Sequence, residues 1–549
     1  MPVIRLDCRD LEELTGLDRD QIIDKIPMIG ADIERIEEDH IDVEFFPNRP
    51  DLFSVEGVAR AMRAFLGLEP GLKAYQVGES GVVLQVEPSV KPIRPFIACA
   101  VVRDLDFTIP SFIEALMGLQ EHIHWVLGRD RKQVSIGIHD ISKVKPPFRY
   151  LGESPDFAFV PLDFDREISM EEILRVHPKG IRFAGILSGM DRFPLIIDAN
   201  GDVLSFPPII NGELTRVTEE TRDLFIEVTG TDEAVNYALN IIVTALVERG
   251  GLIESVRIID LEGEKSMITP DLTPARMTLP ISEASRLIGL DLGVEDCINS
   301  LERMGFGIEG VDGGILSVLI PPYRADILHQ YDLVEDVAIG YGYDRITPEM
   351  PDTPGIGRVH PLETLKSIIR DAMIGLGYFE VMTFTLTSPR MQFEWMRWEE
   401  SGSHITLMHP ISEEQTILRR NILPNLLEIL MLNRHRELPQ RIFEVGDVVV
   451  DEKNELHLAA VSIHAFADFS EVRSLVDAVI SEIWSDRPVK IAPSDNEAFI
   501  PGRRADILLQ DDIVGFFGEI HPDVIRAFEL EHPIVGFEIN ASRMGEVSV

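Results

Sequence analysis

The chain has 549 residues, and its content of 45% hydrophobic and 26% charged residues is typical of a folded protein, which excludes a disordered or fibrous one. The 93 acidic residues outnumber the 51 basic ones and give a formal net charge of −42. A surface this acidic does not bind nucleic acid in general, so any RNA contact must use local basic patches or a partner chain.

The sequence contains no apolar run of membrane-spanning length, and its N-terminus lacks the basic-then-apolar order of a signal peptide. Cys8, Cys99 and Cys297 are far apart and form neither a metal-ligand spacing nor a disulfide framework. These features predict a cytoplasmic protein. Solubility is the simplest explanation of its acidic surface.

Residues 1–80 are predicted to begin with a strand over 3–6 and a helical run over 11–30. A second helix is expected over 54–67, because apolar residues recur there at helical spacing and Gly67 stands where a C-cap is expected. The first segment is therefore expected to be a small module with strands and helices.

Residues 81–268 mix strand-like runs, such as 135–140 and 203–210, with helical runs such as 232–251. This mixture is typical of an α+β domain.

Residues 269–346 are predicted to form a smaller helical module. Three prolines and two glycines occur in 348–357, which predicts a linker over 347–357 and a last domain over 358–549. The helix expected over 362–376 carries an apolar stripe, which indicates either a subunit interface or packing within its own domain.

Four acidic residues gather near the end of the third segment. Asp332, Glu335 and Asp336 share one face of a predicted helix, and Asp326 lies just upstream. Four carboxylates this close are tolerable if they are solvated, if they pair with Arg324 or Arg345, or if a cation such as Mg²⁺ binds their oxygens. Acids in the first helical turns also stabilise the helix dipole without a metal. The spacing alone leaves these interpretations open.

Polar residues at 205–229 suggest a pocket in the second segment. Glu227 and Thr229 are two residues apart, so on a strand they point to the same face, and Ser205 and His139 could join them. Such a group could bind a polar substrate. The alternative is ordinary turn chemistry and an exposed strand face.

Small basic clusters interrupt the acidic sequence. Each is more simply explained as a solvated face or an intersubunit salt bridge than as an RNA contact. They are Arg129–Lys132, Arg419–Arg420, Arg434–Arg436 and Arg503–Arg504.

Several long motifs, in order along the whole chain, resemble the beta subunit of phenylalanyl-tRNA synthetase in its archaeal and eukaryotic form. The motifs are FPNRPDLFSVEGVAR at 46–60, KGIRFAGIL at 179–187, SFPPIING through FIEVTGTD at 205–232, PPYRADILHQYDLVEDVAIGYGYDRI at 321–346, GLGYFEVMTFTLTSP at 375–389, HPISEEQTILRRNILPNLLEIL at 409–430, RIFEVGDV at 441–448 and FGEIHPDVI at 517–525.

The resemblance implies an α+β multidomain protein with a defined module order. Residues 1–80 would be an N-terminal module, 81–268 an editing module that deacylates tRNA, and 269–346 a small magnesium-binding helical module. The last segment, 358–549, would be an antiparallel-sheet domain like a class II synthetase core, but catalytically silent.

The resemblance also implies a division of labour in an assembly of two alpha and two beta chains. The alpha chain would use ATP to attach phenylalanine to its tRNA. In this chain Arg441 and Glu444 resemble a degenerate second class II motif, and the C-terminal part lacks a glycine-rich arginine motif. No catalytic residue for aminoacylation is therefore expected in this chain.

For the editing module, the resemblance implies a pocket of Leu195, Ser205, Glu227 and Thr229, with His139 as a further candidate. The pocket would hydrolyse tyrosine that has been attached to phenylalanine tRNA. Glu227 departs from the family pattern, in which aspartate is the expected archaeal residue.

The resemblance further implies a magnesium site of Asp326, Asp332, Glu335 and Asp336. The alternatives to a ligase subunit are a free-standing tRNA-binding scaffold and a deacylase that acts alone on misacylated tRNA.

Overall fold

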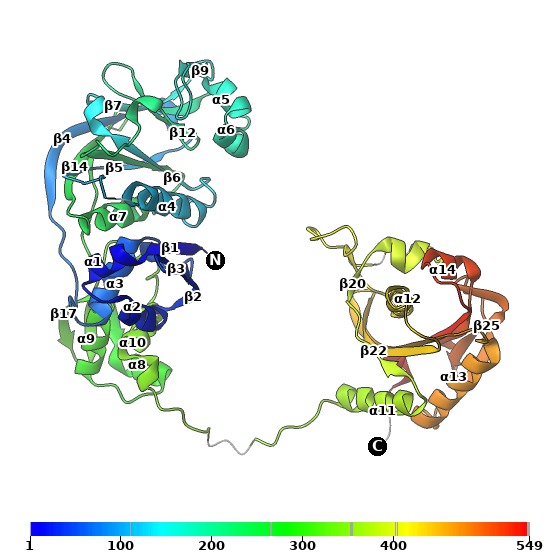
Figure 1. Cartoon of the computed structure of the whole chain (residues 1–549). Coiled ribbons are helices and arrows are strands. Elements are labelled where there is room, and N and C mark those ends of the chain that lie inside the picture. Colours follow the sequence, from blue (N-terminus) through cyan, green and yellow to red (C-terminus); the bar gives the residue numbers. More distant parts are fainter. Residues whose placement is uncertain are drawn as a thin grey trace. The chain divides into compact units, whose positions relative to one another are not determined.

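The chain folds into two compact units, Met1–Met350 and Pro351–Val549, and the boundary between them falls inside the predicted linker (Figure 1). The computed structural model describes residues 2–109, 111–263, 266–351, 355–400, 402 and 404–545. Within these residues no helix combines the length and the apolar character needed to cross a bilayer. The three N-terminal modules predicted from the sequence lie together in the first unit.

The first unit begins with a three-stranded antiparallel sheet in the order β1-β3-β2. Its strands are β1 (Val3–Asp7), β2 (Ala31–Ile36) and β3 (His40–Phe45), and its helices are α1 (Cys8–Thr15), α2 (Arg19–Lys25) and α3 (Val55–Phe65). The side chains of Asp7, Asp18 and Ser54 cap these helices. Gly67 has a φ of 75° and follows the C-cap of α3 by one residue, as an αL glycine usually does.

A ten-stranded sheet forms the middle of the first unit, in the order β12-β11-β10-β7-β4-β14-β5-β13-β6, with β15 paired to β14. The strands are β4 (Val77–Val86), β5 (Phe96–Arg103), β6 (Val134–Asp140), β7 (Phe148–Glu153), β10 (Phe193–Ile197), β11 (Val203–Phe206), β12 (Ile210–Asn211), β13 (Leu224–Gly230), β14 (Leu252–Asp260) and β15 (Ser266–Thr269). Helices α4 (Phe112–Trp125) and α7 (Ala234–Val247) pack on one face of this sheet, where Leu224, Ile226 and Val228 of β13 are buried.

A third sheet, in the order β16-β18-β17, completes the first unit. It contains β16 (Ala275–Pro280), β17 (Gly307–Asp312) and β18 (Ile315–Ile320), with α8 (Ile281–Ile288), α9 (Val294–Arg303) and α10 (Gln330–Tyr341). The smaller elements of this unit are β8 (Ala158–Phe159), β9 (Ile168–Ser169), α5 (Met170–Val176) and α6 (Pro178–Phe183).

One buried arginine ties the middle of the first unit to its N-terminal sheet module. Arg249, just after α7, donates to both carboxylate oxygens of Asp10 at 3.0 and 2.8 Å and to Glu56 at 2.6 Å. All three side chains are at most 8% exposed. Water cannot replace either partner at such a site, so losing one would leave a buried charge unpaired.

The second unit is built on a seven-stranded sheet in the order β19-β22-β23-β27-β26-β25-β24. Every strand pair is antiparallel except β19 with β22, which confirms the expected antiparallel-sheet domain. The strands are β19 (Phe379–Glu380), β22 (Gln440–Val450), β23 (Lys453–Ile463), β24 (Val489–Pro493), β25 (Phe499–Leu509), β26 (Asp512–Ile520) and β27 (Ile534–Asn540).

Helices cover both faces of this sheet. Successive side chains of a strand point to opposite faces, and in this sheet both faces are apolar. Leu458 and Ala460 of β23 lie in one core with α11 (Pro361–Gly375) and α13 (Phe469–Ile483), whereas Ala459 and Val461 lie in another with α12 (Leu423–Leu432). The unit also contains β20 (Leu386–Thr387), β21 (Ile417–Leu418), α14 (Pro522–Ala527) and α15 (Ala541–Met544).

The apolar stripe of α11 is divided between two environments. Leu365, Ile369 and Met373 of the stripe are buried in the core of their own unit, which agrees with packing inside the domain. Leu362 and Leu376, at the two ends of the stripe, are exposed at 42% and 37%. Only the exposed part of the stripe is free to contact another chain.

We expect Ile369→Asp to lower the free energy of unfolding of the second unit by about 3–5 kcal/mol, because it places an unpaired carboxylate in a dry core. Ile374→Asp, on the exposed side of the same helix, should change it by less than about 0.5 kcal/mol. Urea unfolding followed by circular dichroism measures both. Equal stabilities for the two variants would contradict the burial of Ile369.

Candidate functional site

The candidate pocket residues Glu227 and Thr229 lie on β13, in the interior of the ten-stranded sheet. This strand pairs with β5 on one side and β6 on the other, so that Glu227 stands opposite Cys99 and Gly137. Both side chains point to the sheet face that α4 and α7 leave uncovered. Because hydrogen bonds hold both edges of β13, the backbone under these residues is fixed.

The structure brings three of the predicted pocket residues together. Ser205 Oγ donates to Glu227 Oε1 at 2.9 Å, and His139 Nε2 lies 3.9 Å from the same oxygen. Each of these residues is at most 2% exposed. Neither Glu227 Oε2 nor His139 Nε2 has a hydrogen-bond partner among the described residues. Two unpaired polar atoms in a buried place are costly, so they point to a binding partner.

Gly137 makes room for this arrangement. A Cβ atom at this position would lie 2.2 Å from Glu227 Oε1 and 2.7 Å from His139 Nε2. Gly137 and His139 are two residues apart on β6 and share a face, so the period of the strand could have identified this glycine from the sequence.

Thr215 orients the ring of His139, a contact that the sequence did not reveal. His139 Nδ1 lies 2.8 Å from Thr215 Oγ1, and that hydroxyl donates to the carbonyl of Gly212 at 3.4 Å. With the threonine proton used in this way, Nδ1 is the donor and Nε2 of the neutral ring is left as an acceptor beside Glu227.

Thr229 lies on the same strand face as Glu227 but has a different partner. Arg94 Nε donates to Thr229 Oγ1 at 3.0 Å, which leaves the threonine's own proton for another acceptor. Burial lowers the pKa of Arg94. Leu195 lies in an apolar cluster with Leu151 and Phe206.

A cysteine beside the pocket is unsuited to nucleophilic attack. Cys99 is fully buried opposite Glu227, and burial, followed by the nearby carboxylate, raises the pKa of its thiol well above the usual value. A thiol that stays protonated is a poor nucleophile. Glu227 and His139 therefore offer unpaired hydrogen-bonding atoms, and the residues described around them include no activated side-chain nucleophile.

Three of the four acids predicted to hold magnesium have other partners in this chain. Arg324 binds Asp326 through two hydrogen bonds of 2.8 and 2.7 Å, and Asp336 at 2.5 Å. Asp332 accepts two backbone amides at 2.7 Å each and caps α10, while Glu335 is exposed. These contacts favour the helix-terminal interpretation for Asp332 and the pairing with Arg324 for Asp326 and Asp336, and the magnesium site stays a prediction.

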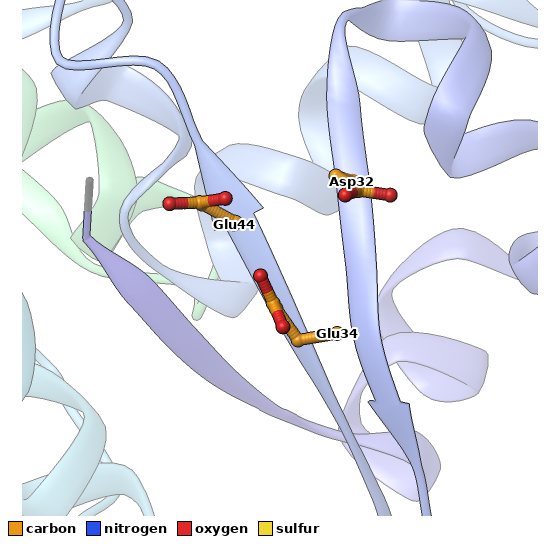
Figure 2. A group of neighbouring side chains, drawn as sticks. All are labelled: Asp32, Glu34 and Glu44. Carbon is orange, nitrogen blue, oxygen red and sulfur yellow. The ribbon is translucent and has the colours of Figure 1, made fainter. Parts of the chain in front are cut away.

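A different group of acids lies close together in the first sheet (Figure 2). Asp32, Glu34 and Glu44 on β2 and β3 place carboxylate oxygens within 4.8 Å of one another, the only such group of three or more His, Cys, Asp or Glu residues in the described part of the chain. These side chains are exposed or half-buried, and exposed acidic groups of this kind are common without an ion.

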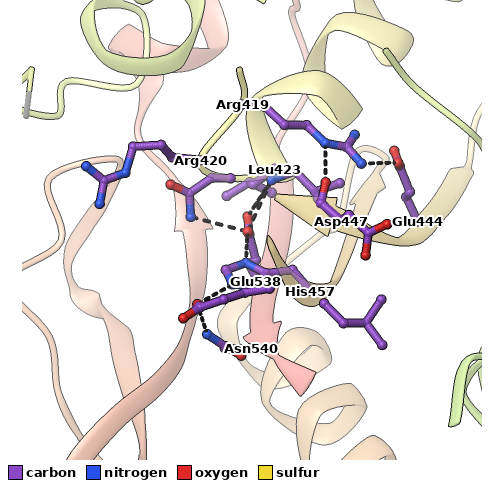
Figure 3. Close-up of polar contacts among 12 residues, drawn as sticks. Arg419, Arg420, Leu423, Glu444, Asp447, His457, Glu538 and Asn540 are labelled. Carbon is purple, nitrogen blue, oxygen red and sulfur yellow. Dashed lines mark hydrogen bonds and ion pairs between the residues drawn. The ribbon is translucent and has the colours of Figure 1, made fainter. Parts of the chain in front are cut away.

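In the second unit, a buried ion pair occupies the place of the degenerate second motif (Figure 3). Glu444 accepts from Arg419 at 2.7 Å, and Arg419 also donates to the carbonyl of Asp447 at 2.9 Å. Arg441 is half-exposed and lies 3.8 Å from Glu471. Because Glu444 already neutralises Arg419, this arginine is not available to hold a nucleotide phosphate.

Glu538 is the second buried acid of this region, and it caps α12. Its carboxylate accepts the backbone amides of Ile422 and Leu423 at 2.9–3.1 Å and contacts His457 Nδ1 at 2.6 Å (Figure 3). A carboxylate at a helix N-terminus is favourable because the helix dipole is positive there. The carboxylate of Glu538 is thus satisfied within the chain, whereas Nε2 of His457 has no hydrogen-bond partner among the described residues.

The basic clusters differ in burial and in pairing. Arg131 and Arg419 are at most 4% exposed and pair with Glu121 and Glu444, so the interpretation as solvated faces or intersubunit bridges is wrong for them. Arg434 and Arg503 are exposed and form ion pairs within the second unit.

Two family models match the chain. Residues 346–541 match the phenylalanyl tRNA synthetase beta chain CLM domain, and residues 277–343 match the tRNA synthetase B5 domain. The first match covers the seven-stranded sheet, and the second covers the three-stranded sheet with α8, α9 and α10.

Similar proteins cover the whole length. A phenylalanine–tRNA ligase beta subunit from Methanothrix thermoacetophila is 56% identical over 99% of this chain and 100% of its own, and one from Archaeoglobus fulgidus is 51% identical over 99% and 98%. A crystal structure of an N-terminal fragment of the phenylalanyl-tRNA synthetase beta subunit from Pyrococcus horikoshii is 37% identical, with a TM-score of 0.60, and covers 62% of this chain and 99% of the fragment. The chain therefore belongs to the family of phenylalanine–tRNA ligase beta subunits.

Proposed function

We propose that this chain assembles with an alpha subunit that uses ATP to attach phenylalanine to its tRNA, and that its own Glu227 pocket removes tyrosine attached in error. The names of its relatives as beta subunits support the assembly. The unpaired Glu227 Oε2, buried beside Ser205 and His139, is the observation that carries the editing site.

Tyrosine differs from phenylalanine by one hydroxyl group. An apolar synthetic pocket rejects an added hydroxyl only weakly, so a second site must select for it. A buried carboxylate oxygen does this, because the tyrosine hydroxyl donates to it whereas phenylalanine leaves it unpaired. Ser205 occupies Oε1, which leaves Oε2 for the substrate.

Hydrolysis would use water, because the pocket holds no activated nucleophile among the described residues. Water attacks the ester carbonyl, the bond from the carbonyl carbon to the ribose oxygen breaks, and the ribose oxygen leaves with a proton. Thr229 has a free proton to donate, and His139 Nε2 is a free acceptor close to Glu227. Both are within the same sealed region, where hydrogen bonds are stronger than in water.

Glu227→Ala should slow the hydrolysis of tyrosine-charged phenylalanine tRNA by roughly 10- to 150-fold, because a hydrogen bond to a charged group contributes about 1.5–3 kcal/mol. Glu227→Asp should retain the activity or improve it. Deacylation of pre-charged tRNA by the assembled enzyme measures both variants, with phenylalanine charging as the control. Unchanged deacylation by the alanine variant would show that the tyrosine hydroxyl binds elsewhere. If phenylalanine charging is lost together with deacylation, the role of Glu227 is to support the fold.

The chain expressed without a partner should show no phenylalanine-dependent exchange between ATP and pyrophosphate. The reason is that the carboxylates of Glu444 and Glu538 pair with groups of the chain itself, and Arg419 pairs with Glu444, so these charges are not free to bind ATP. Exchange above background by the pure chain, and its loss in Arg419→Ala, would overturn this expectation.

Asp332→Ala should lower the free energy of unfolding of the first unit by about 1 kcal/mol through loss of the α10 cap, and equally in magnesium and in EDTA. Glu335→Ala, on an exposed side chain, is the matched control and should have little effect. Thermal melts of both variants decide the matter. If magnesium stabilises the parent, and this stabilisation disappears when Asp332→Ala and Glu335→Ala are combined in one variant, the metal site is supported instead.

A further inference from the structure

A pocket of about 250 Å³ lies in the first unit next to the proposed editing residues. Its lining includes Arg94, Lys132 and Thr231 on one side and the apolar Ile186, Leu187 and Met190 on the other. The last three belong to or follow the 3₁₀ helix η5 (Ala184–Leu187). The pocket therefore combines cationic and apolar walls.

Arg94 joins this pocket to Thr229. The same guanidinium that lines the pocket donates to the hydroxyl of Thr229 at 3.0 Å and to its carbonyl at 2.8 Å. Thr231 of the lining is two residues beyond Thr229, and Glu227 is two residues before it. The pocket is thus one side chain away from the site where the tyrosine hydroxyl would bind.

The charge of the pocket is opposite to that of the chain. None of its lining residues, all of them described, is acidic, although the chain carries 93 acidic residues against 51 basic ones. The acids that act on Arg94 are Glu227 and Asp232, and neither lines the pocket. Asp232 Oδ1 accepts the backbone amide of Ala234. An anion would find two positive groups here and no like charge on the walls.

A strained loop places Lys132. The three residues before it, Arg129, Asp130 and Arg131, have φ values of 45°, 57° and 66°, a region that residues with a side chain rarely adopt. Arg94 holds the end of this loop by donating to the carbonyls of Arg131 and Lys132 at 3.3 and 3.2 Å. Strain that neighbouring contacts maintain is a common sign of a functional position.

The buried side chain of Arg131 holds the loop from the other side. It donates to Glu121 at 2.6 Å and to the carbonyl of Ile209 at 3.0 Å, close to Ser205 in sequence. The basic cluster at 129–132 is thus divided: Arg131 is structural, and Lys132 is exposed at the pocket.

We propose that this pocket binds the terminal nucleotide of the charged tRNA, with its phosphate at Lys132 and Arg94 and its base against Ile186, Leu187 and Met190. The proposal rests on the proposed editing function. A phosphate is the anion that an aminoacyl ester on tRNA brings closest to its amino acid, and lysine and arginine are its usual partners. Bound there, the nucleotide directs its ester toward Thr229 and Glu227.

The test uses Lys132→Glu in the assembled enzyme, with deacylation of tyrosine-charged phenylalanine tRNA as the reaction. The half-saturating tRNA concentration should rise about fivefold or more. In a plot of log affinity against log salt concentration, the slope should become less steep by about 0.7, which corresponds to the loss of one phosphate contact. The effect should fall on this concentration rather than on the maximal rate.

Lys143→Glu is the matched control. It makes the same charge change on another exposed lysine of the same module, past the opposite end of the seven-residue strand β6 and so about 20 Å away. This variant should behave like the parent. Equal effects of the two substitutions, or none from Lys132→Glu, would overturn the proposal.

A binding measurement separates this proposal from the editing function. Adenosine 5′-monophosphate, titrated into the full chain, should bind more tightly than adenosine, and Lys132→Glu should abolish the difference. If the parent enzyme does not deacylate tyrosine-charged tRNA but still binds adenosine 5′-monophosphate more tightly than adenosine, the editing function is wrong and the nucleotide-binding pocket is supported. If the two ligands bind the parent equally, the pocket proposal fails.

Discussion

Arginines that are buried beside the chain's own carboxylates hold this very acidic protein together. Arg249 joins the end of α7 to α1 and α3, Arg324 joins the segment that precedes α10 to Asp336 inside that helix, and Arg419 joins the segment after β21 to β22. Removing any of them would leave a carboxylate buried without a counter-charge, which costs several kcal/mol. This pairing explains why a large net charge is compatible with two compact units: the excess acids lie outside the cores.

The same pairing separates structural charges from functional ones. Around Arg419 and Glu538 the carboxylates are paired with arginine, histidine and backbone groups of the chain itself, so these clusters support the fold. The proposed editing pocket is different, because Glu227 Oε2 and His139 Nε2 are buried and unpaired. Buried polar atoms are usually satisfied. Others without a partner occur elsewhere in the described chain, such as Trp484 Nε1, but these two belong to side chains that approach each other across neighbouring strands, where a ligand could pair with both.

Much of the architecture could be predicted because local patterns determine it. Helical spacing located α3 and α11, and the period of two placed Glu227 and Thr229 on one face of a strand. A partner distant in sequence could not be predicted: Arg94 reaches Thr229 across 135 positions. Arg324, which is close in sequence to Asp326 and Asp336, is a candidate partner for these acids from the sequence, and the structure pairs it with both. Residue spacing predicts which side chains share a face of a helix or strand, but it does not predict which residue from elsewhere in the chain packs against that face.

The position of β13 inside the sheet has an evolutionary consequence. Because both neighbouring strands fix its backbone, the depth of the carboxylate at position 227 can change only with the length of the side chain. Aspartate and glutamate differ there by one methylene group, about 1.5 Å, which is half a hydrogen bond length. Relatives that exchange these two acids must therefore compensate with the opposing residues, and Gly137, where a Cβ would already collide with the longer acid, is the position at which such covariation should be found.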